Sequence, residues 1–250
     1  MNTEKSMKLY TLGTSHGAAE LNRACSTNLL MVNGSYYIFD CGGDIEYKIV
    51  NLGISFADVR AVFITHMHED HVGKLSSIVK TYTSHNKSDS HILIHMPEQS
   101  GIDAFKGWLK GMHIRPEVDT VSYQLVTPGQ VYRDENITVS AIATKHMKQG
   151  EFPSYAYLVE TADKKVLYTG DVSRAFTDYP QIVFQEDFDL ILCELVHYDF
   201  TEQFDTIVKS RTKKMVFTHV KYTKIEQLLK FTGQFPFEVS IAEDGNVYEI

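Results

Sequence analysis

The stretch AVFITHMHEDHVGKL, Ala61 to Leu75, decides what fold and what chemistry we expect of this chain. An apolar, strand-like run leads directly into His66, His68, Asp70 and His71. Histidine nitrogens and carboxylate oxygens are the usual ligands of zinc and similar divalent ions. Alternate side chains of an extended segment point the same way, so His66 and His68 can hold one ion. Asp70 and His71 follow once the chain has turned, and they can hold a neighbouring ion.

Three further ligand candidates stand at the ends of apolar, strand-like runs. His146 ends VSAIATKH, Asp171 ends KVLYTGD, and His219 ends KMVFTH. Sites are commonly built where strands give way to exposed loops. With the first cluster these residues make seven candidates, about the number that two four- to five-coordinate ions require. The sequence therefore predicts a site for two divalent metal ions.

Size and composition narrow the class of protein. The net charge of −8 argues against a broad basic surface for nucleic acid. Three cysteines without a CxxC pair indicate reduced thiols in a cytoplasmic protein. The opening MNTEKSMKLYTLG lacks the apolar stretch of a secretory signal, and no apolar run approaches the roughly 18 residues of a membrane span. We therefore expect a cytoplasmic protein with no membrane partner and no strong nucleic-acid surface.

Short strand-like runs outnumber helical stretches along the chain. Helical patterns cover residues 43–54, 73–84, 101–112 and 224–233. Strand patterns cover residues 8–13, 28–32, 36–42, 61–66, 91–96, 137–146, 154–161, 165–171, 190–195, 214–219, 238–245 and 247–250. Two sheets packed face to face with helices outside satisfy this pattern. We expect one domain over residues 1–250, made of two similar halves that join near residues 118–130.

The helical stretch 101–112 has a clear apolar face. Phe105, Trp108, Leu109 and Met112 recur at helical spacing. We expect this face to pack inward, either onto the core or as a wall of the pocket.

The ordered set of motifs resembles the metallo-β-lactamase superfamily. HMHEDH, then His146, then Asp171 in TGD, then His219 follow one another as in that family, over nearly the whole chain. The resemblance implies an α/β fold, the αββα four-layer sandwich of two mixed sheets with helices on the outer faces. It also implies a dinuclear site at one edge that holds zinc, with manganese or iron as alternatives. Asp40, in YYIFDCGG, matches an early aspartate that supports the site from behind.

The resemblance also assigns the ligands to the two ions. On this assignment the first ion takes His66, His68 and His146, the second takes Asp70, His71 and His219, and Asp171 bridges them.

Within the superfamily, the opening LGTSHGAAELNRACSTNLLMVNGSYYIFDCGG is similar to the branch of ribonuclease Z and the small phosphodiesterases. Two features differ from ribonuclease Z. The gap of 25 residues between His146 and Asp171 is too short for that enzyme's long tRNA-gripping arm. The family's HEAT segment falls on CELV, where Cys193 replaces the histidine. Both features favour a smaller phosphodiester over tRNA.

The expected chemistry is hydrolysis by a hydroxide that two cations share, because metal binding lowers the pKa of water from 15.7 to about 7. Asp70 would both ligate and orient this nucleophile. His197 in CELVHY and His16 in GTSHG are the candidates for protonating the leaving oxygen, since the family places both loops near the metals.

Several functions stay open at this point. The first is a hydrolase of a small or cyclic phosphodiester. The alternatives are hydrolysis of a carboxylic ester or lactone, cleavage of RNA, and a sensor that holds metals without turnover. Arg174 could grip a phosphate, and the nearest tyrosine beyond Asp171 for a lactone-type site is Tyr179. The basic segment KSRTKKM, residues 209–215, is read as solvated, and the sequence leaves open whether the chain forms a homodimer.

Overall fold

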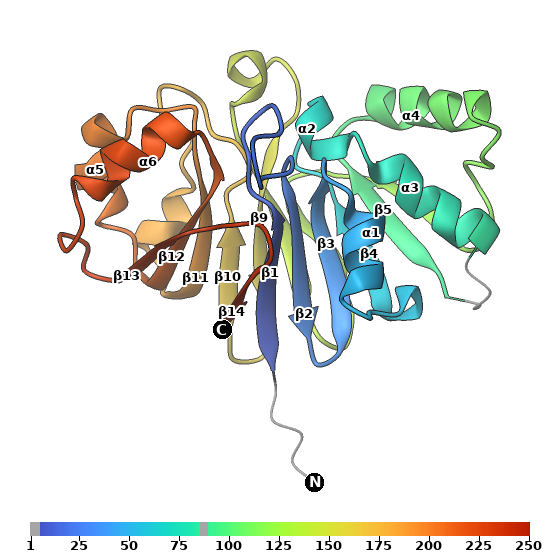
Figure 1. Cartoon of the computed structure of the whole chain (residues 1–250), viewed down its shortest axis with the longest axis horizontal. Helices are drawn as coiled ribbons and strands as arrows, with labels where there is room; N and C mark the ends of the chain where they lie inside the picture. Colours follow the sequence, from blue (N-terminus) through green and yellow to red (C-terminus); the bar gives the residue numbers. More distant parts are fainter. Residues whose placement is uncertain (1–5, 86–89) are drawn as a thin grey trace, which may run out of the picture.

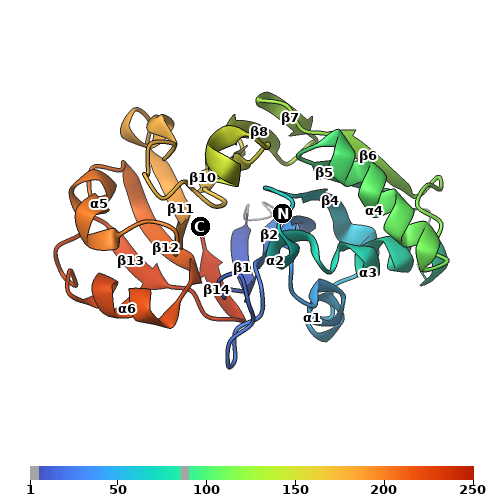
Figure 2. The ribbon, with the colours of Figure 1, turned by 90° about the horizontal axis from the view of Figure 1, so that it is seen from above.

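Two sheets stack face to face and carry helices on their outer surfaces (Figures 1 and 2). The structure is a computed structural model that describes residues 6–85 and 90–250. The expected α/β sandwich of two mixed sheets is confirmed. Among the described residues, no helix is both long and apolar enough to cross a membrane. The division into one domain of two similar halves stays a prediction.

The first sheet has seven strands in the order β14-β1-β2-β3-β4-β5-β6. From β14 to β3 the neighbours are antiparallel, and from β3 to β6 they are parallel. The bounds are β1 (Met7–Gly13), β2 (Thr27–Val32), β3 (Ser35–Cys41), β4 (Val59–Phe63), β5 (Ile92–Met96), β6 (Val121–Leu125) and β14 (Asn246–Glu249).

The second sheet has the order β13-β12-β11-β10-β9-β8-β7. Here β7 to β10 are antiparallel, and β10 to β13 are parallel, so the pattern of the first sheet recurs. The bounds are β7 (Gly129–Arg133), β8 (Thr138–Ala143), β9 (Tyr155–Glu160), β10 (Lys165–Tyr168), β11 (Phe188–Leu195), β12 (Thr212–Val220) and β13 (Glu238–Ile241).

The helices flank the two sheets and leave one edge of the sandwich to loops (Figure 2). The first sheet is covered by α1 (Ile45–Asn51), α3 (Leu75–Lys80) and α4 (Gln99–Gly111), and the second by α5 (Phe200–Ile207) and α6 (Tyr222–Leu229). The short α2 (Glu69–Val72) lies at the edge that β4 reaches (Figure 1). Single turns are η1 (Phe56–Asp58), η2 (Thr81–His85), η3 (Met147–Gly150) and η4 (Gln181–Phe184).

Apolar side chains fill three layers, one between the sheets and one under each set of helices. Between the sheets Phe39 stacks on Phe63 with ring centroids 5.0 Å apart, and Tyr157 meets Phe63 at 5.5 Å. Central strands that are covered on both faces read as continuous apolar runs, which explains why their sequences were recognisable.

Four elements were missed by the sequence pattern: β6, β7, α2 and α5. The strands β6 (VSYQL) and β7 (GQVYR) end their sheets, and most of their side chains are only partly buried. An edge strand pairs on one side only and can carry polar residues, so it lacks the apolar signature of a central strand.

The expected inward face of α4 is correct except at Trp108. Phe105 and Leu109 are buried, and Met112 packs against the same core. Trp108 is 63% exposed, which contradicts the sequence prediction. The buried stripe is centred on Ile102, Phe105 and Leu109, and Trp108 lies at its margin, where the helix already turns toward solvent.

We predict a pH-dependent loss of stability that originates at His95. This ring is fully buried and stacks on Phe63 at 4.6 Å, and its two nitrogens face the carbonyls of Val131 at 3.2 Å and Val62 at 3.3 Å. Burial lowers its pKa to about 4, so the folded state resists a proton that the unfolded chain accepts below about pH 6.5. The stabilisation is present above pH 6.5 and is lost as the pH falls toward 4, by roughly 2 kcal/mol between pH 7 and pH 5.

The measurement is urea unfolding of the wild type and of His95→Phe at both pH values. The variant keeps the aromatic stack but cannot titrate. The wild type should lose about 2 kcal/mol more than the variant on acidification. Equal losses would contradict this role for His95.

Candidate metal centre

The loop after β4 and the short α2 present the first four ligand candidates. His66 and His68 lie in the loop, and His68 is the N-cap residue directly before α2. Asp70 and His71 belong to α2 itself, and both are buried. α2 packs directly on the end of β3, where a Cβ on Gly42 would collide with the Asp70 carbonyl. Only glycine fits at this position, so Gly42 allows the helix to reach the sheet edge.

The second sheet brings the other three candidates to the same edge. His146 follows β8, Asp171 follows β10, and His219 lies near the end of β12. Because β10, β11 and β12 are parallel, their carboxyl ends meet at one side of the sheet. His219 has a φ of 51°, an uncommon conformation for a residue with a side chain, and Asp40 at the end of β3 has a φ of 63°. Such backbone positions are typical of functional sites.

Three imidazoles and one carboxylate form the first group. His66 Nε2 lies 2.9 Å from His68 Nδ1, and His146 Nε2 lies 3.3 Å from the same atom. Asp171 Oδ2 lies 3.7 Å from His66 Nε2 and 3.5 Å from His146 Nε2. Ring nitrogens and a carboxylate oxygen that converge in this way form a ligand set that could hold a metal ion.

The second group shares the Asp171 carboxylate with the first. Asp70, His71 and His219 offer ligand atoms within 4.8 Å of one another. Asp171 Oδ2 lies 3.4 Å from Nε2 of both His71 and His219. One carboxylate oxygen therefore lies between both groups, and its role as a bridging ligand stays a prediction.

Residues that hydrogen-bond the ligand imidazoles determine which ring nitrogen faces the metal site. His71 Nδ1 donates to Asp40 Oδ2 at 2.7 Å, and His66 Nδ1 lies 3.0 Å from Thr65 Oγ1. Thr65 Oγ1 in turn donates to Asp40. A hydrogen bond at Nδ1 fixes the tautomer and leaves the lone pair on Nε2 for a metal. Asp40, expected to support the site, is fully buried at this position.

The protonation preferences suit metal ligands. Burial lowers the pKa values of His66, His68 and His146, so these rings are neutral near pH 7. Burial opposes charge on Asp171, but the imidazoles of His219 and His71 hold its pKa well below the usual range. Neutral imidazoles and an ionised carboxylate are the forms that bind cations.

His71 shows the opposite tendency, and its cause supports a cation at this place. Burial opposes a charge on its ring, yet the carboxylates of Asp171 and Asp40 raise its pKa well above the ordinary value. The carboxylates of Asp171 and Asp40 therefore favour a positive charge at the position of the His71 ring. His71 Nε2 and Asp171 Oδ1 are buried without a hydrogen-bond partner among the described residues. Buried polar atoms are rarely left unpaired, so these two atoms fit a site that binds metal.

The two predicted proton donors are placed differently. The His197 ring lies beside the centre, 4.4 Å from the His146 ring, and its Nδ1 is 3.6 Å from Asp171 Oδ2. His16 contacts Glu20 at 3.0 Å, and its neighbour Gly17 lies close to Asp70. The structure therefore brings His197 into the cluster and leaves His16 at the rim.

Glu194 is a site residue that the sequence analysis did not assign. Its Oε1 lies 3.1 Å from His197 Nδ1, and its Oε2 accepts from the backbone of Val196 and His197. Burial opposes charge on His197, but the hydrogen bond and charge of Glu194 raise its pKa to about 9. A fully buried glutamate inside the apolar run LILCEL was the available signal. Cys193, at the HEAT histidine position, is buried among apolar side chains instead.

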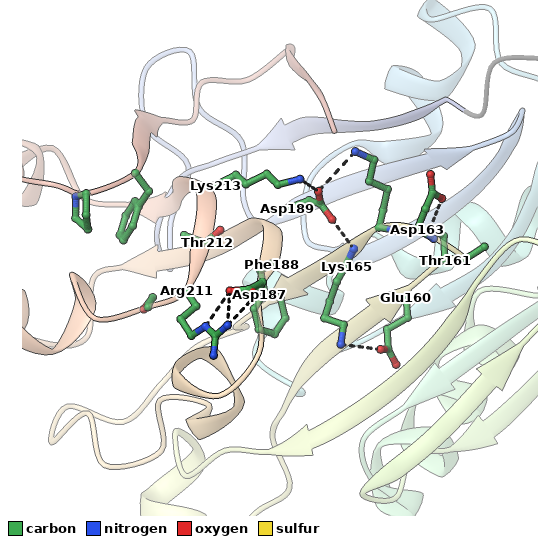
Figure 3. A pocket seen from close by; sticks show the side chains of 15 residues that line it. Glu160, Thr161, Asp163, Lys165, Asp187, Phe188, Asp189, Arg211, Thr212 and Lys213 are labelled. Atoms are coloured by element: carbon green, nitrogen blue, oxygen red, sulfur yellow. Dashed lines mark hydrogen bonds and ion pairs between the residues drawn. The ribbon is translucent and has the colours of Figure 1, made fainter.

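A surface hollow of about 810 Å³ lies at the opposite ends of β10, β11 and β12 (Figure 3). Its size alone would suggest a binding site. Its cations are already neutralised: Arg211 pairs with Asp187, Lys213 with Asp189, and Lys165 with Glu160. None of the seven ligand candidates lines it. The chemistry therefore belongs to the other edge of the sheet.

We predict that the wild-type chain holds two ions roughly 3.5 Å apart. His66→Ala should empty mainly the first site and His219→Ala mainly the second. His66 groups with His68 and His146, whereas His219 groups with Asp70 and His71 and also with Asp171 and His197. Elemental analysis of protein never exposed to chelator should find about two ions in the wild type and one in each variant.

His91→Ala is the control, since this exposed histidine bonds only Ser122 among the described contacts. One ion or none in the wild type would count heavily against the two-ion site.

The chain is similar to several known proteins. A ribonuclease Z from Shouchella clausii (strain KSM-K16) is 27% identical over 161 residues, which are 63% of this chain and 49% of the relative. The chain thus spans about half the length of the curated relatives it matches. YhfI from Bacillus subtilis, a metallo-β-lactamase fold protein, superposes with a TM-score of 0.76 at 21% identity, covering 99% of this chain and 100% of that one. A diphosphatase from the PhnP family superposes with a TM-score of 0.74 at 15% identity, covering 98% of both chains.

These similarities confirm the resemblance to the metallo-β-lactamase superfamily near ribonuclease Z. A family model described as anti-Pycsar protein Apyc1 matches residues 7–238. Because this match covers nearly the whole chain, the protein belongs to the family of anti-Pycsar protein Apyc1.

Proposed function

We propose that the protein is a dinuclear metal-dependent phosphodiesterase that hydrolyses a small or cyclic phosphodiester. The observation that carries the proposal is the position of Asp171 Oδ2, 3.4 to 3.7 Å from ring nitrogens of both ligand groups. Zinc is the proposed metal because the ligand set is rich in imidazole, which manganese or iron would also accept. We place the enzyme in the cytoplasm, in keeping with its free cysteines.

When bound, the two ions supply a nucleophile at neutral pH and neutralise charge on the phosphate oxygens. The chain sets the charge of the centre. Its ligands are neutral imidazoles and two carboxylates, Asp70 and Asp171. Two divalent cations less two carboxylate charges leave a net charge of about +2, which attracts a phosphodiester monoanion. Asp70 lies at the side of this centre, where its carboxylate can hold and orient the attacking oxygen.

His197 is the proposed proton donor to the leaving oxygen. Glu194 grips both the ring and the backbone of this residue, so the imidazole is held beside Asp171. A histidine that hydrogen-bonds a buried carboxylate keeps its proton at neutral pH and can give it up as the leaving group gains charge. His16, which Glu20 holds at the rim, is the second candidate for this role.

Two features support a small substrate. Residues between His146 and Asp171 form η3, β9 and β10, which use up most of the segment in which ribonuclease Z carries its tRNA arm. The basic residues of segment 209–215 are partly neutralised, since Arg211, Lys213 and Lys214 each pair with a carboxylate. Recognition of RNA depends on many free phosphate contacts. RNA cleavage stays the second candidate, because the curated relatives are named ribonuclease Z.

Tyr179 bears on the lactone alternative. This tyrosine is fully buried, and its hydroxyl lies 3.0 Å from Ser210 Oγ. It therefore does not reach the centre, which argues against a lactone-type site. Arg174 is exposed, so its guanidinium is available to bind a phosphate.

Asp70→Asn should lower kcat by on the order of 100-fold while changing KM little, because the lost charge matters most in the transition state. Steady-state kinetics on bis(p-nitrophenyl) phosphate measure both constants. Glu69→Gln is the matched control, since Glu69 is an exposed carboxylate in the same helix and outside both ligand groups. Wild-type kcat in the Asn variant would remove Asp70 from the mechanism.

Substrate size is tested by direct competition. The wild type should turn over the chromogenic diester and should not process the 3′ end of a precursor tRNA efficiently at low salt. A panel of lactones tests the ester alternative in the same assay. Fast, site-specific tRNA cleavage would replace the small-substrate proposal with the ribonuclease.

A further inference from the structure

Tyr168 connects the second sheet to the support of the ligand cluster on the first. It ends β10 and is almost fully buried between the sheets, where its ring meets Phe39 edge-on at 6.3 Å. Its hydroxyl donates to Asp40 Oδ2 at 2.7 Å and lies 3.0 Å from Ser26 Oγ. Burial raises the pKa of this phenol well above its ordinary value, so it is a donor at neutral pH.

Asp40 receives four hydrogen bonds from the described residues. Thr65 gives two, from its amide at 2.8 Å and its hydroxyl at 3.0 Å, and His71 Nδ1 gives the third at 2.7 Å. Tyr168 gives the fourth, and it is the one of these donors that comes from the second sheet. A buried carboxylate with several donors keeps one orientation, and that orientation is passed to the group bonded to it.

The His71 ring is held by contacts at both of its nitrogens. Its Nδ1 side is held by Asp40 and through it by Tyr168, while its Nε2 side faces Asp171 at 3.4 Å. Tyr168 and Asp171 are three residues apart on the same strand extension. The end of β10 and the residues directly after it therefore position both the Asp171 carboxylate and, through Tyr168 and Asp40, the imidazole of His71.

We propose that Tyr168 is a positioning residue for the second metal ion, acting through Asp40 and His71. The proposal rests on the two-ion centre of the proposed function. Without the phenolic hydroxyl, Asp40 can rotate toward Thr65 and carry His71 with it, so His71 Nε2 leaves the position that suits the ion. The first ion depends on His66, His68 and His146. Of these, His66 reaches Asp40 only indirectly, through the Thr65 hydroxyl, whereas His71 bonds Asp40 directly.

The chain offers a closely matched control in Tyr37. This tyrosine is also fully buried between the sheets, and its hydroxyl donates at 2.6 Å to a carboxylate, Asp134. Asp134 likewise receives three other hydrogen bonds, from Tyr132, Asn136 and Ile137. Tyr37→Phe therefore removes the same kind of bond from a carboxylate away from the metal centre, although Asp134 is partly exposed and Asp40 is fully buried.

The experiment titrates metal-free wild type, Tyr168→Phe and Tyr37→Phe with zinc in competition with a chromogenic chelator. Tyr168→Phe should weaken the second zinc ion at least about 10-fold and affect the first much less. Tyr37→Phe should leave both affinities at wild type, while both variants show a similar lowering of the thermal midpoint of the metal-free protein. Ser26→Ala, which removes the other partner of the Tyr168 hydroxyl, should weaken the second ion slightly.

Three results would overturn the proposal. Wild-type affinity for both ions in Tyr168→Phe and in Ser26→Ala would show that the hydroxyl has no positioning role. An equal loss in Tyr37→Phe would assign the effect to general destabilisation. A wild type that binds no second zinc ion would remove the two-ion centre itself, which distinguishes failure of the proposed function from failure of the role of Tyr168.

Discussion

The buried carboxylate of Asp171 is the constraint on which the rest of the site depends. One of its oxygens lies within 3.7 Å of ring nitrogens from five histidines, which come from loops, from α2 and from the end of β12. Such an ionised group cannot stay buried without positive charge around it. The stacked sheets bring the carboxyl ends of β4, β10 and β12 to one edge, and this convergence makes the arrangement possible. The fold thus brings seven polar side chains together at one edge of an apolar core.

The sequence predicted the sandwich and all seven clustered residues, and the reason is local. A polar ligand directly after an apolar run can be recognised from the sequence alone, as with His146, Asp171 and His219. The central strands were equally visible because they are covered on both sides. The edge strands β6 and β7 were missed, since partial exposure gives them a mixed composition.

The sequence pattern could not predict side chains that act on the site only through hydrogen bonds to other residues. Tyr168 looks like any aromatic residue of a strand, and its bond to Asp40 exists only because the two sheets stack. Glu194 left a weak signal as a charged residue in an apolar run, yet its partner His197 is set by a turn that the sequence does not specify. Trp108 was misplaced because helical periodicity defines the centre of a buried stripe better than its margin.

The central claim is that two ions occupy this edge and share Asp171. Anomalous diffraction from crystals of the zinc-loaded protein tests it most directly. The account predicts two strong peaks roughly 3.5 Å apart, one among His66, His68 and His146 and the other beside His71 and His219, with an oxygen of Asp171 between them. A single peak, or peaks away from Asp171, would contradict it.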